Sequence, residues 1–132
     1  MTSTNRQEVM NVAAFRAALR SFLRESELAA RGSGLTPQRY LLLLMVKGAP
    51  DGSERATVTD LVDRLGLAQS TVTELVRRAE DIGLLEREAS DVDGRVMHLR
   101  LSAEGERRLA EAFTRLDVER GRLREAFAEL ER

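Results

Sequence analysis

Apolar side chains recur every three or four positions near the start of the chain, which is the spacing of one face of a helix over residues 5–30. The positions that mark this face are Val9, Val12, Phe15, Leu19, Phe22 and Leu23. Two glycines, Gly32 and Gly34, follow, and glycine tolerates the backbone angles that a helix exit requires. The pattern therefore predicts a long helix close to the N-terminus.

A second helix is predicted to begin at Thr36. A threonine hydroxyl can accept hydrogen bonds from the free amides of a first turn, and Pro37 fits that turn because its nitrogen has no proton to leave unpaired. Residues 40–46 are apolar on every side, which is typical of a helix buried at the centre of a domain. The polar, glycine-containing stretch 48–53 then predicts a turn.

Two shorter helices are predicted next, over about 58–65 and 69–82. Thr57 followed three residues later by Asp60 is the capping-box pattern that marks a helix start. Gly66 ends the first of these helices and Gly83 ends the second. Two helices joined by a short turn that contains glycine form the helix-turn-helix arrangement.

After residue 83 the apolar pattern changes to alternation, which predicts strands over 84–89 and 96–101 with a polar turn at 90–95. A final helix is predicted from about 103 to 131, with Ser102 as its cap and a length of roughly 40 Å. Its apolar face carries Leu109, Phe113, Leu116, Leu123, Phe127 and Leu130. A domain this small cannot cover such a helix, so we expect the terminal helices to pack against a second chain.

The predicted fold class is therefore mainly α with a small β-hairpin wing, a winged helix-turn-helix with long terminal dimerisation helices. We expect a single domain over 1–132, in which 5–31 and 103–132 are the dimerisation helices. Residues 36–102 are expected to form the DNA-binding region.

Composition excludes several classes of site. The chain has no cysteine, which removes disulfides, thiolate metal ligands and cysteine nucleophiles, and its single histidine, His98, cannot form a histidine metal cluster. We therefore expect no metal, no cofactor and no enzymatic activity. The longest apolar run, 40–46, is far shorter than the ~20 residues that span a bilayer, and no signal region follows the N-terminus. We expect a cytoplasmic protein without a membrane partner.

The helix predicted at 69–82 has a polar face suited to DNA. Its outward positions and the flanking helix start carry the candidate DNA contacts Gln69, Ser70, Thr71, Thr73, Glu74 and Arg77. Small side chains allow close approach to a major groove, and Arg77 is long enough to reach a guanine edge or a phosphate. The alternative is an ordinary solvated amphipathic helix. Residues 57–102 contain six arginines and nine acidic residues, a net charge of −3, so DNA binding requires the acids to face away.

The predicted hairpin tip holds a second candidate contact. In the sequence Asp93-Gly94-Arg95, the carboxylate can hold the guanidinium extended while glycine permits the tight turn. An extended arginine at this position suits the negative potential of a minor groove. The alternative is a common Asp-Gly turn beside a solvated arginine.

In order and spacing, six segments resemble the MarR family of winged helix-turn-helix transcriptional regulators. These are residues 35–40 (LTPQRY), 57–67 (TVTDLVDRLGL), 69–78 (QSTVTELVRR), 83–87 (GLLER), 93–95 (DGR) and 101–105 (LSAEG). The sequence departs from the family pattern at Ala68, where a serine or threonine cap is usual, and at Glu74, where a basic or small residue is usual.

The resemblance implies a homodimer that binds a pseudo-palindromic operator in double-stranded DNA as a repressor. It also implies recognition helices in successive major grooves and Arg95, oriented by Asp93, in each flanking minor groove. Many members of the family release DNA when a small aromatic or phenolic effector binds. The residues expected to line such a site here are Phe22, Tyr40 and Leu44, although each is also a common core residue.

Two other functions fit parts of the sequence. A winged helix can serve as a protein–protein interaction module that does not bind DNA, and the acidic balance of 57–102 together with Glu74 favours that alternative. An enzyme lacks support, because the chain offers one histidine, no cysteine and no glycine-rich phosphate loop.

Overall fold

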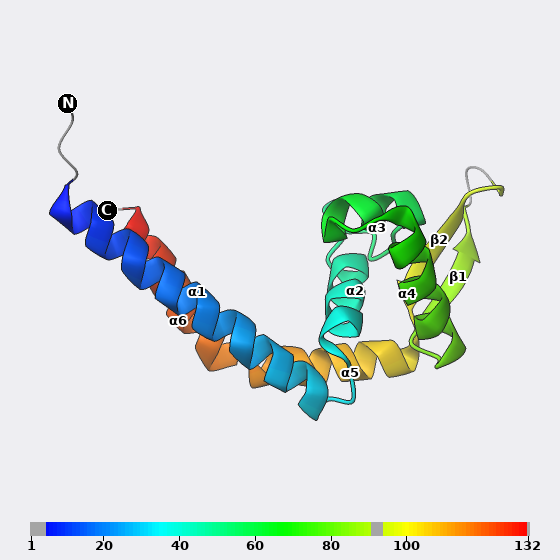
Figure 1. The fold of residues 1–132 in the computed structure, drawn as a ribbon. Coiled ribbons are helices and arrows are strands. Elements are labelled where there is room, and N and C mark those ends of the chain that lie inside the picture. Colours follow the sequence, from blue (N-terminus) through cyan, green and yellow to red (C-terminus); the bar gives the residue numbers. More distant parts are fainter. Residues whose placement is uncertain (1–4, 91–93, 132) are drawn as a thin grey trace.

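A computed structural model of the protein describes residues 5–90 and 94–131. The elements are α1 (Arg6–Gly32), α2 (Pro37–Lys47), α3 (Val58–Leu65), α4 (Gln69–Asp81), β1 (Leu85–Ala89), β2 (Met97–Leu101), α5 (Ala103–Arg115) and α6 (Asp117–Leu130). Figure 1 shows two parts, an arm in which α1 and α6 lie side by side and a lobe built from α2, α3, α4 and the hairpin. Helix α5 runs beneath both parts and joins them.

The winged helix-turn-helix fold predicted from the sequence is confirmed, and so are the helix starts in the lobe. The Thr36 hydroxyl accepts a hydrogen bond from the Arg39 amide at 3.2 Å. Thr57 and Asp60 form the predicted capping box, with reciprocal bonds of 3.1 and 2.9 Å. Gly66 ends α3 at a φ of 66°, a left-handed conformation that favours glycine.

The prediction of one continuous helix over 103–131 is wrong, because the chain turns at Leu116 between α5 and α6. The Leu116 side chain is only 1% exposed, so the turn places it in the core. At the break, the Phe113 carbonyl accepts hydrogen bonds from the Leu116 amide at 3.1 Å and from the Arg120 guanidinium. This guanidinium also lies 3.6 Å from the centre of the Phe113 ring. Helix α6 can then run back along α1, where Phe127 meets Phe15 edge to face at 6.1 Å.

The hairpin is antiparallel, with a register that runs from Leu85 opposite Leu101 to Ala89 opposite Met97. The sequence did not predict a third backbone segment on its outer edge. There Ala56 exchanges two hydrogen bonds with Leu99, of 3.0 and 2.7 Å. These bonds fix the hairpin to the segment that enters α3.

The core of the lobe gathers around α2, as its continuous apolar run predicts. Tyr40, Leu42, Leu43 and Val46 are buried, whereas Leu41 is 43% exposed on the side that faces α1. The remaining fully buried large side chains are Leu61, Val72, Val76, Leu84, Leu99 and Leu116. No helix in the described parts of the chain is long and apolar enough to cross a membrane.

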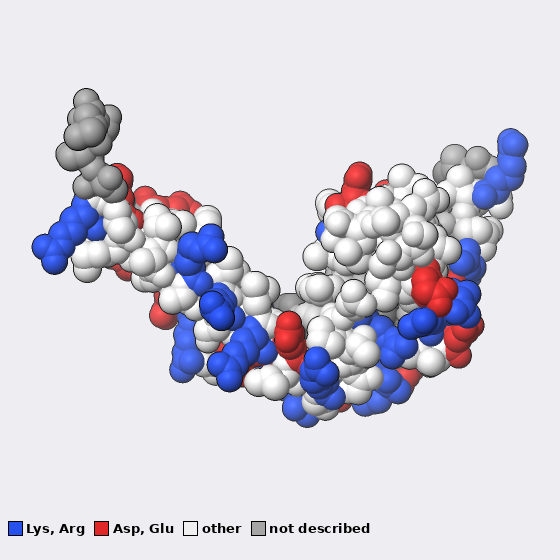
Figure 2. Space-filling model, viewed as in Figure 1, with Lys and Arg blue, Asp and Glu red and all other residues white. Residues whose placement is uncertain are grey.

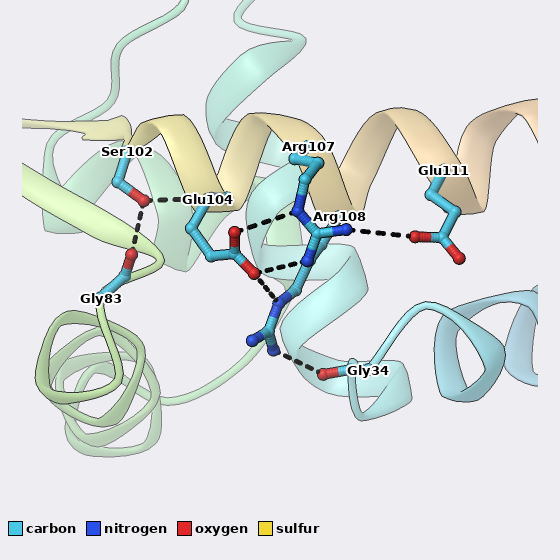
Figure 3. A network of polar contacts seen from close by, with 8 residues as sticks. Gly34, Gly83, Ser102, Glu104, Arg107, Arg108 and Glu111 are labelled. Carbon is cyan, nitrogen blue, oxygen red and sulfur yellow. Dashed lines mark hydrogen bonds and ion pairs between the residues drawn. The ribbon is translucent and has the colours of Figure 1, made fainter.

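Helix α5 approaches the lobe at its N-terminal end through a glycine. A Cβ atom built on Gly105 would lie 2.2 Å from the carbonyl oxygen of Leu84. The Ser102 hydroxyl donates a hydrogen bond to the Gly83 carbonyl and accepts one from the Gly105 amide at 3.0 Å (Figure 3). The segment that follows α4 and the start of α5 are therefore held together by a close backbone approach and by the Ser102 hydroxyl.

Gly105→Ala should destabilise the protein, because its methyl group would meet a backbone oxygen that cannot rotate away. We expect the free energy of unfolding to fall by about 1–3 kcal/mol, measured by urea denaturation at one protein concentration. Gly121→Ala in α6 is the matched control, since no atom lies within 4 Å of the added Cβ. That change should stabilise the protein by roughly 0.5–1 kcal/mol, and equal effects of the two alanines would contradict the packing argument.

Candidate nucleic-acid interface

Helix α4 has one packed face and one face open to solvent, as its sequence pattern predicts. Val72, Val76 and Ala79 have no exposed surface and fix the helix against the lobe. The candidate contacts on the opposite side are exposed, except that Glu74 is partly covered; they are Gln69, Ser70, Thr71, Thr73, Glu74 and Arg77. The structure therefore brings all six predicted residues to one surface.

The first turn of α4 differs from the starts of α3 and α5. Thr57 and Ser102 cap those helices with their hydroxyls, whereas Ala68 precedes α4 without a side-chain hydrogen bond. The first amides of α4 thus receive no acceptor from the cap residue, and the helix dipole places positive potential at that end. Uncharged Ser70 and Thr71 leave room there for a phosphate.

The second half of the exposed face carries a charge network on α4 itself, which we call the Arg77 network: Glu74, Arg77, Arg78 and Asp81. The Glu74 carboxylate accepts bonds from Nε and Nη2 of Arg77 at 2.9 and 2.6 Å. It also accepts one from Nε of Arg78 at 2.9 Å, and Asp81 accepts one from Nη1 of Arg77 at 3.0 Å. The hydrogen bonds from Arg77 and Arg78 lower the pKa of Glu74 from 4.5 to about 2.

The acidic residues behind this face have arginine partners. Glu80 pairs with Arg87 at 2.9 Å, and on the hairpin Glu86 pairs with Arg100 at 3.2 Å. Glu88 pairs with Arg55 at 2.7 Å. Figure 2 shows the result as blue and red side chains that intermix where the hairpin joins the lobe. Among the described residues, Glu74, Glu80, Asp81, Glu86 and Glu88 are thus each paired with an arginine.

The structure adds a polar neighbour that the sequence pattern did not indicate. Gln38, in the first turn of α2, borders a shallow depression together with Ser70, Thr71 and Glu74. It lies thirty-two positions before Ser70 in the chain, and no local spacing relates the two residues. Only the packing of α2 against α4 brings Gln38 to the candidate interface.

The hairpin projects from the lobe at the end away from the arm (Figure 1). Arg95 is exposed near its tip, as predicted. Asp93, the residue expected to orient Arg95, lies outside the described residues. Arg95 is therefore a second candidate contact, on a different element from α4.

Tyr40, one of three predicted effector contacts, borders a cavity of about 170 Å³ where α1 meets α2. The other lining residues are Leu23, Ser26, Glu27, Pro37 and Leu41. Burial raises the pKa of Tyr40. Phe22 instead borders a separate depression between α1 and α6, and Leu44 packs against the lobe core. Of the three predicted effector contacts, only Tyr40 thus borders this cavity. Glu27, which also lines it, was not predicted from the sequence. Within 5–90 and 94–131, no three His, Cys, Asp or Glu side chains are grouped to hold a metal.

Residues 33–96 match the sequence model of the MarR family. No curated protein sequence is significantly similar to the chain. Among solved structures, it resembles transcriptional regulator Tm0710 from Thermotoga maritima, with 25% identity, a TM-score of 0.65 and coverage of 87% of this chain and 76% of that one.

Two further similar structures concern DNA binding. One is a mutant of MepR from S. aureus bound to an oligodeoxyribonucleotide, with 18% identity, a TM-score of 0.66 and coverage of 84% and 79% of the two chains. The other is BpsR from Bordetella bronchiseptica, whose DNA binding is regulated by 6-hydroxynicotinic acid. It has 18% identity, a TM-score of 0.60 and coverage of 82% and 79%. These structures share the fold described above.

The low pKa of Glu74 can be tested by following its carboxyl carbon through an acid titration by NMR. The midpoint should lie near 2, and Arg77→Ala should raise it toward 4.5 because the main hydrogen-bond donor is lost. The folded pKa is depressed, so the pairing stabilises the fold fully above pH 4.5 and is lost as the pH falls through about 2. Glu104, whose pKa is also about 2, is the internal control and should not respond to Arg77→Ala. A Glu74 midpoint that does not move in the variant would rule out the pairing in solution.

Proposed function

We propose that this chain, whose residues 33–96 match the sequence model of the MarR family, is a transcriptional regulator that binds a pseudo-palindromic DNA operator as a homodimer and represses transcription. The observation that carries the proposal is the exposed α4 surface, with its uncharged first turn and uncapped amides, beside a projecting hairpin that presents Arg95. A helix of this kind suits a major groove and a hairpin arginine suits the adjacent minor groove. Binding to chromosomal DNA agrees with the cytoplasmic location expected from the sequence. We propose no enzymatic activity for the protein.

The proposal of a homodimer rests on the arm. Of twelve large apolar side chains that are exposed in the described residues, eight lie on the arm helices and α5. These are Val9, Met10, Val12, Leu23, Leu28, Phe113, Val118 and Phe127. Exposed apolar surface of this extent on one part of a molecule marks an interface with another chain.

We expect sedimentation equilibrium at micromolar concentration to give twice the chain mass of 14.8 kDa. An obligate dimer of this kind should bury roughly 2,000 Å² or more. Sedimentation as a monomer at this concentration would exclude the homodimer and, with it, the pseudo-palindromic operator.

The proposed minor-groove contact predicts a preference outside the sequence that α4 contacts. Duplexes selected by the protein from a random library should prefer A·T pairs at both flanks, because a narrow minor groove concentrates negative potential. Arg95→Ala should weaken binding, remove that preference and lower the salt dependence by about two charges per dimer. The fold and dimer should survive, since Arg95 is exposed. A variant that keeps wild-type affinity and flank preference would show that the hairpin does not contact DNA.

We further propose that a small effector releases the DNA and that it binds the cavity beside Tyr40. The cavity lies where the arm meets the lobe, so an occupant would contact both α1 and α2. Glu27 is the one charged residue in its lining. A carboxylate therefore favours an effector with a phenolic hydroxyl or a cationic group over an acid. BpsR, with its aromatic regulator, supports control of this general kind.

A second function, protein–protein recognition without DNA, is favoured only by the acidic balance of residues 57–102. The library selection distinguishes the two. A DNA-binding regulator enriches a defined duplex with a steep salt dependence, whereas a protein-binding module enriches none.

A further inference from the structure

The Arg77 network holds its central arginine in a defined position on an exposed surface. The side chains of Glu74, Arg77 and Asp81 are 45%, 59% and 61% exposed, so solvent or a ligand can reach all three. Glu74 lies one turn before Arg77 and Asp81 lies one turn after it. The guanidinium is thereby bound by a carboxylate on either side along the helix axis.

The hydrogen-bonding capacity that remains on Arg77 matches one base edge. A guanidinium has five N–H donors, and three of these are used by Glu74 and Asp81. Two donors are left. In the major groove, guanine presents two neighbouring acceptors, O6 and N7, and two arginine donors are the partners they most often find.

The charge of the network disfavours binding to phosphates. Two arginines, Arg77 and Arg78, are balanced by the two carboxylates of Glu74 and Asp81. A phosphate would be repelled by both carboxylates, whereas the neutral edge of guanine would meet only the remaining donors. The arrangement therefore favours a base contact over a contact with the DNA backbone.

The same spacing occurs on α5, where it has a different use (Figure 3). Glu104 pairs with Arg107 and Arg108, and Arg107 lies 3.5 Å from Glu111. There Arg108 also donates to the Gly34 carbonyl at 2.9 Å, so this copy joins α5 to the segment between α1 and α2. On α4, every partner that the described residues supply to Arg77 and Arg78 lies on α4 itself.

We propose that Glu74 and Asp81 are positioning residues that direct Arg77 to the O6 and N7 edge of one guanine in each half-site. They also limit its binding to phosphates of unrelated sequences, so they set specificity without contacting a base. The inference rests on the proposed function, since it assumes that α4 enters a major groove.

The test uses a duplex selected by the wild-type protein from a random library and the same duplex with 7-deazaguanine, which lacks the N7 acceptor, at each guanine in turn. One guanine per half-site should be sensitive, with a loss of roughly tenfold in wild-type affinity. Arg77→Ala should bind the two duplexes equally. Glu74→Gln should reduce the loss of affinity that 7-deazaguanine causes. It should also tighten binding to an unrelated duplex and steepen the salt dependence of that binding by about two charges per dimer.

Glu104→Gln is the matched control, because it removes the same charge from the same spacing on α5 and should change neither the 7-deazaguanine effect nor the salt dependence. Asp81→Asn provides a second variant, expected to act in the direction of Glu74→Gln. Circular dichroism verifies the fold of each variant. If no guanine depends on Arg77, or if Glu74→Gln behaves like Glu104→Gln, the inference is wrong although a duplex is still selected. If the wild-type protein selects no duplex, the proposed function itself fails.

Discussion

The geometry of the molecule depends on one close contact, between the backbone of Gly105 and the carbonyl of Leu84. Leu84 follows the end of α4, and Gly105 lies in the first turn of α5, so the contact sets where α4 stands relative to α5. Ser102 reinforces it with one hydroxyl that bonds to both sides of the junction. Contacts to backbone cannot adjust as side chains do, so this junction fixes the segment that follows α4 against the first turn of α5.

The other end of α5 is fixed in a different way. At Leu116 the chain turns, and the Phe113 carbonyl accepts hydrogen bonds from both the Leu116 amide and the Arg120 guanidinium. Arg108 meanwhile ties the middle of α5 to Gly34, beside the start of α2. Helix α5 thus contacts both α1 in the arm and α2 in the lobe, the two helices that line the cavity beside Tyr40. Because α2 contacts both α1 and α4, a ligand that moved α2 relative to α1 would also act on α4, and this is the physical route for the proposed control of DNA binding.

Most of the fold could be predicted from local sequence, because capping residues and turn glycines mark where its helices begin and end. Thr57 with Asp60, Ser102 and Gly66 each signal a helix end through groups within four residues, and the structure confirms them. The turn at Leu116 could not be predicted, since an apolar residue at helical spacing looks the same whether it continues a helix or anchors a bend. Contacts between segments that are far apart in the chain could not be predicted either. Neither the pairing of Ala56 with Leu99 nor the approach of Gln38 to α4 follows from any period in the sequence.

For the candidate site, the exposed face of α4 followed from its period, but the role of its charges did not. The sequence shows Glu74 as an acid that should repel DNA, whereas the structure shows it bound to two arginines. This difference bears on how a chain of net charge −1 could recognise DNA at all. Without an excess of positive charge, attraction at long range is weak, and counterions are released only where individual basic side chains meet phosphates. Affinity must then come from contacts that form only when the groove and the protein surface fit each other. Such a surface gains specificity, because unrelated sequences provide few of these contacts.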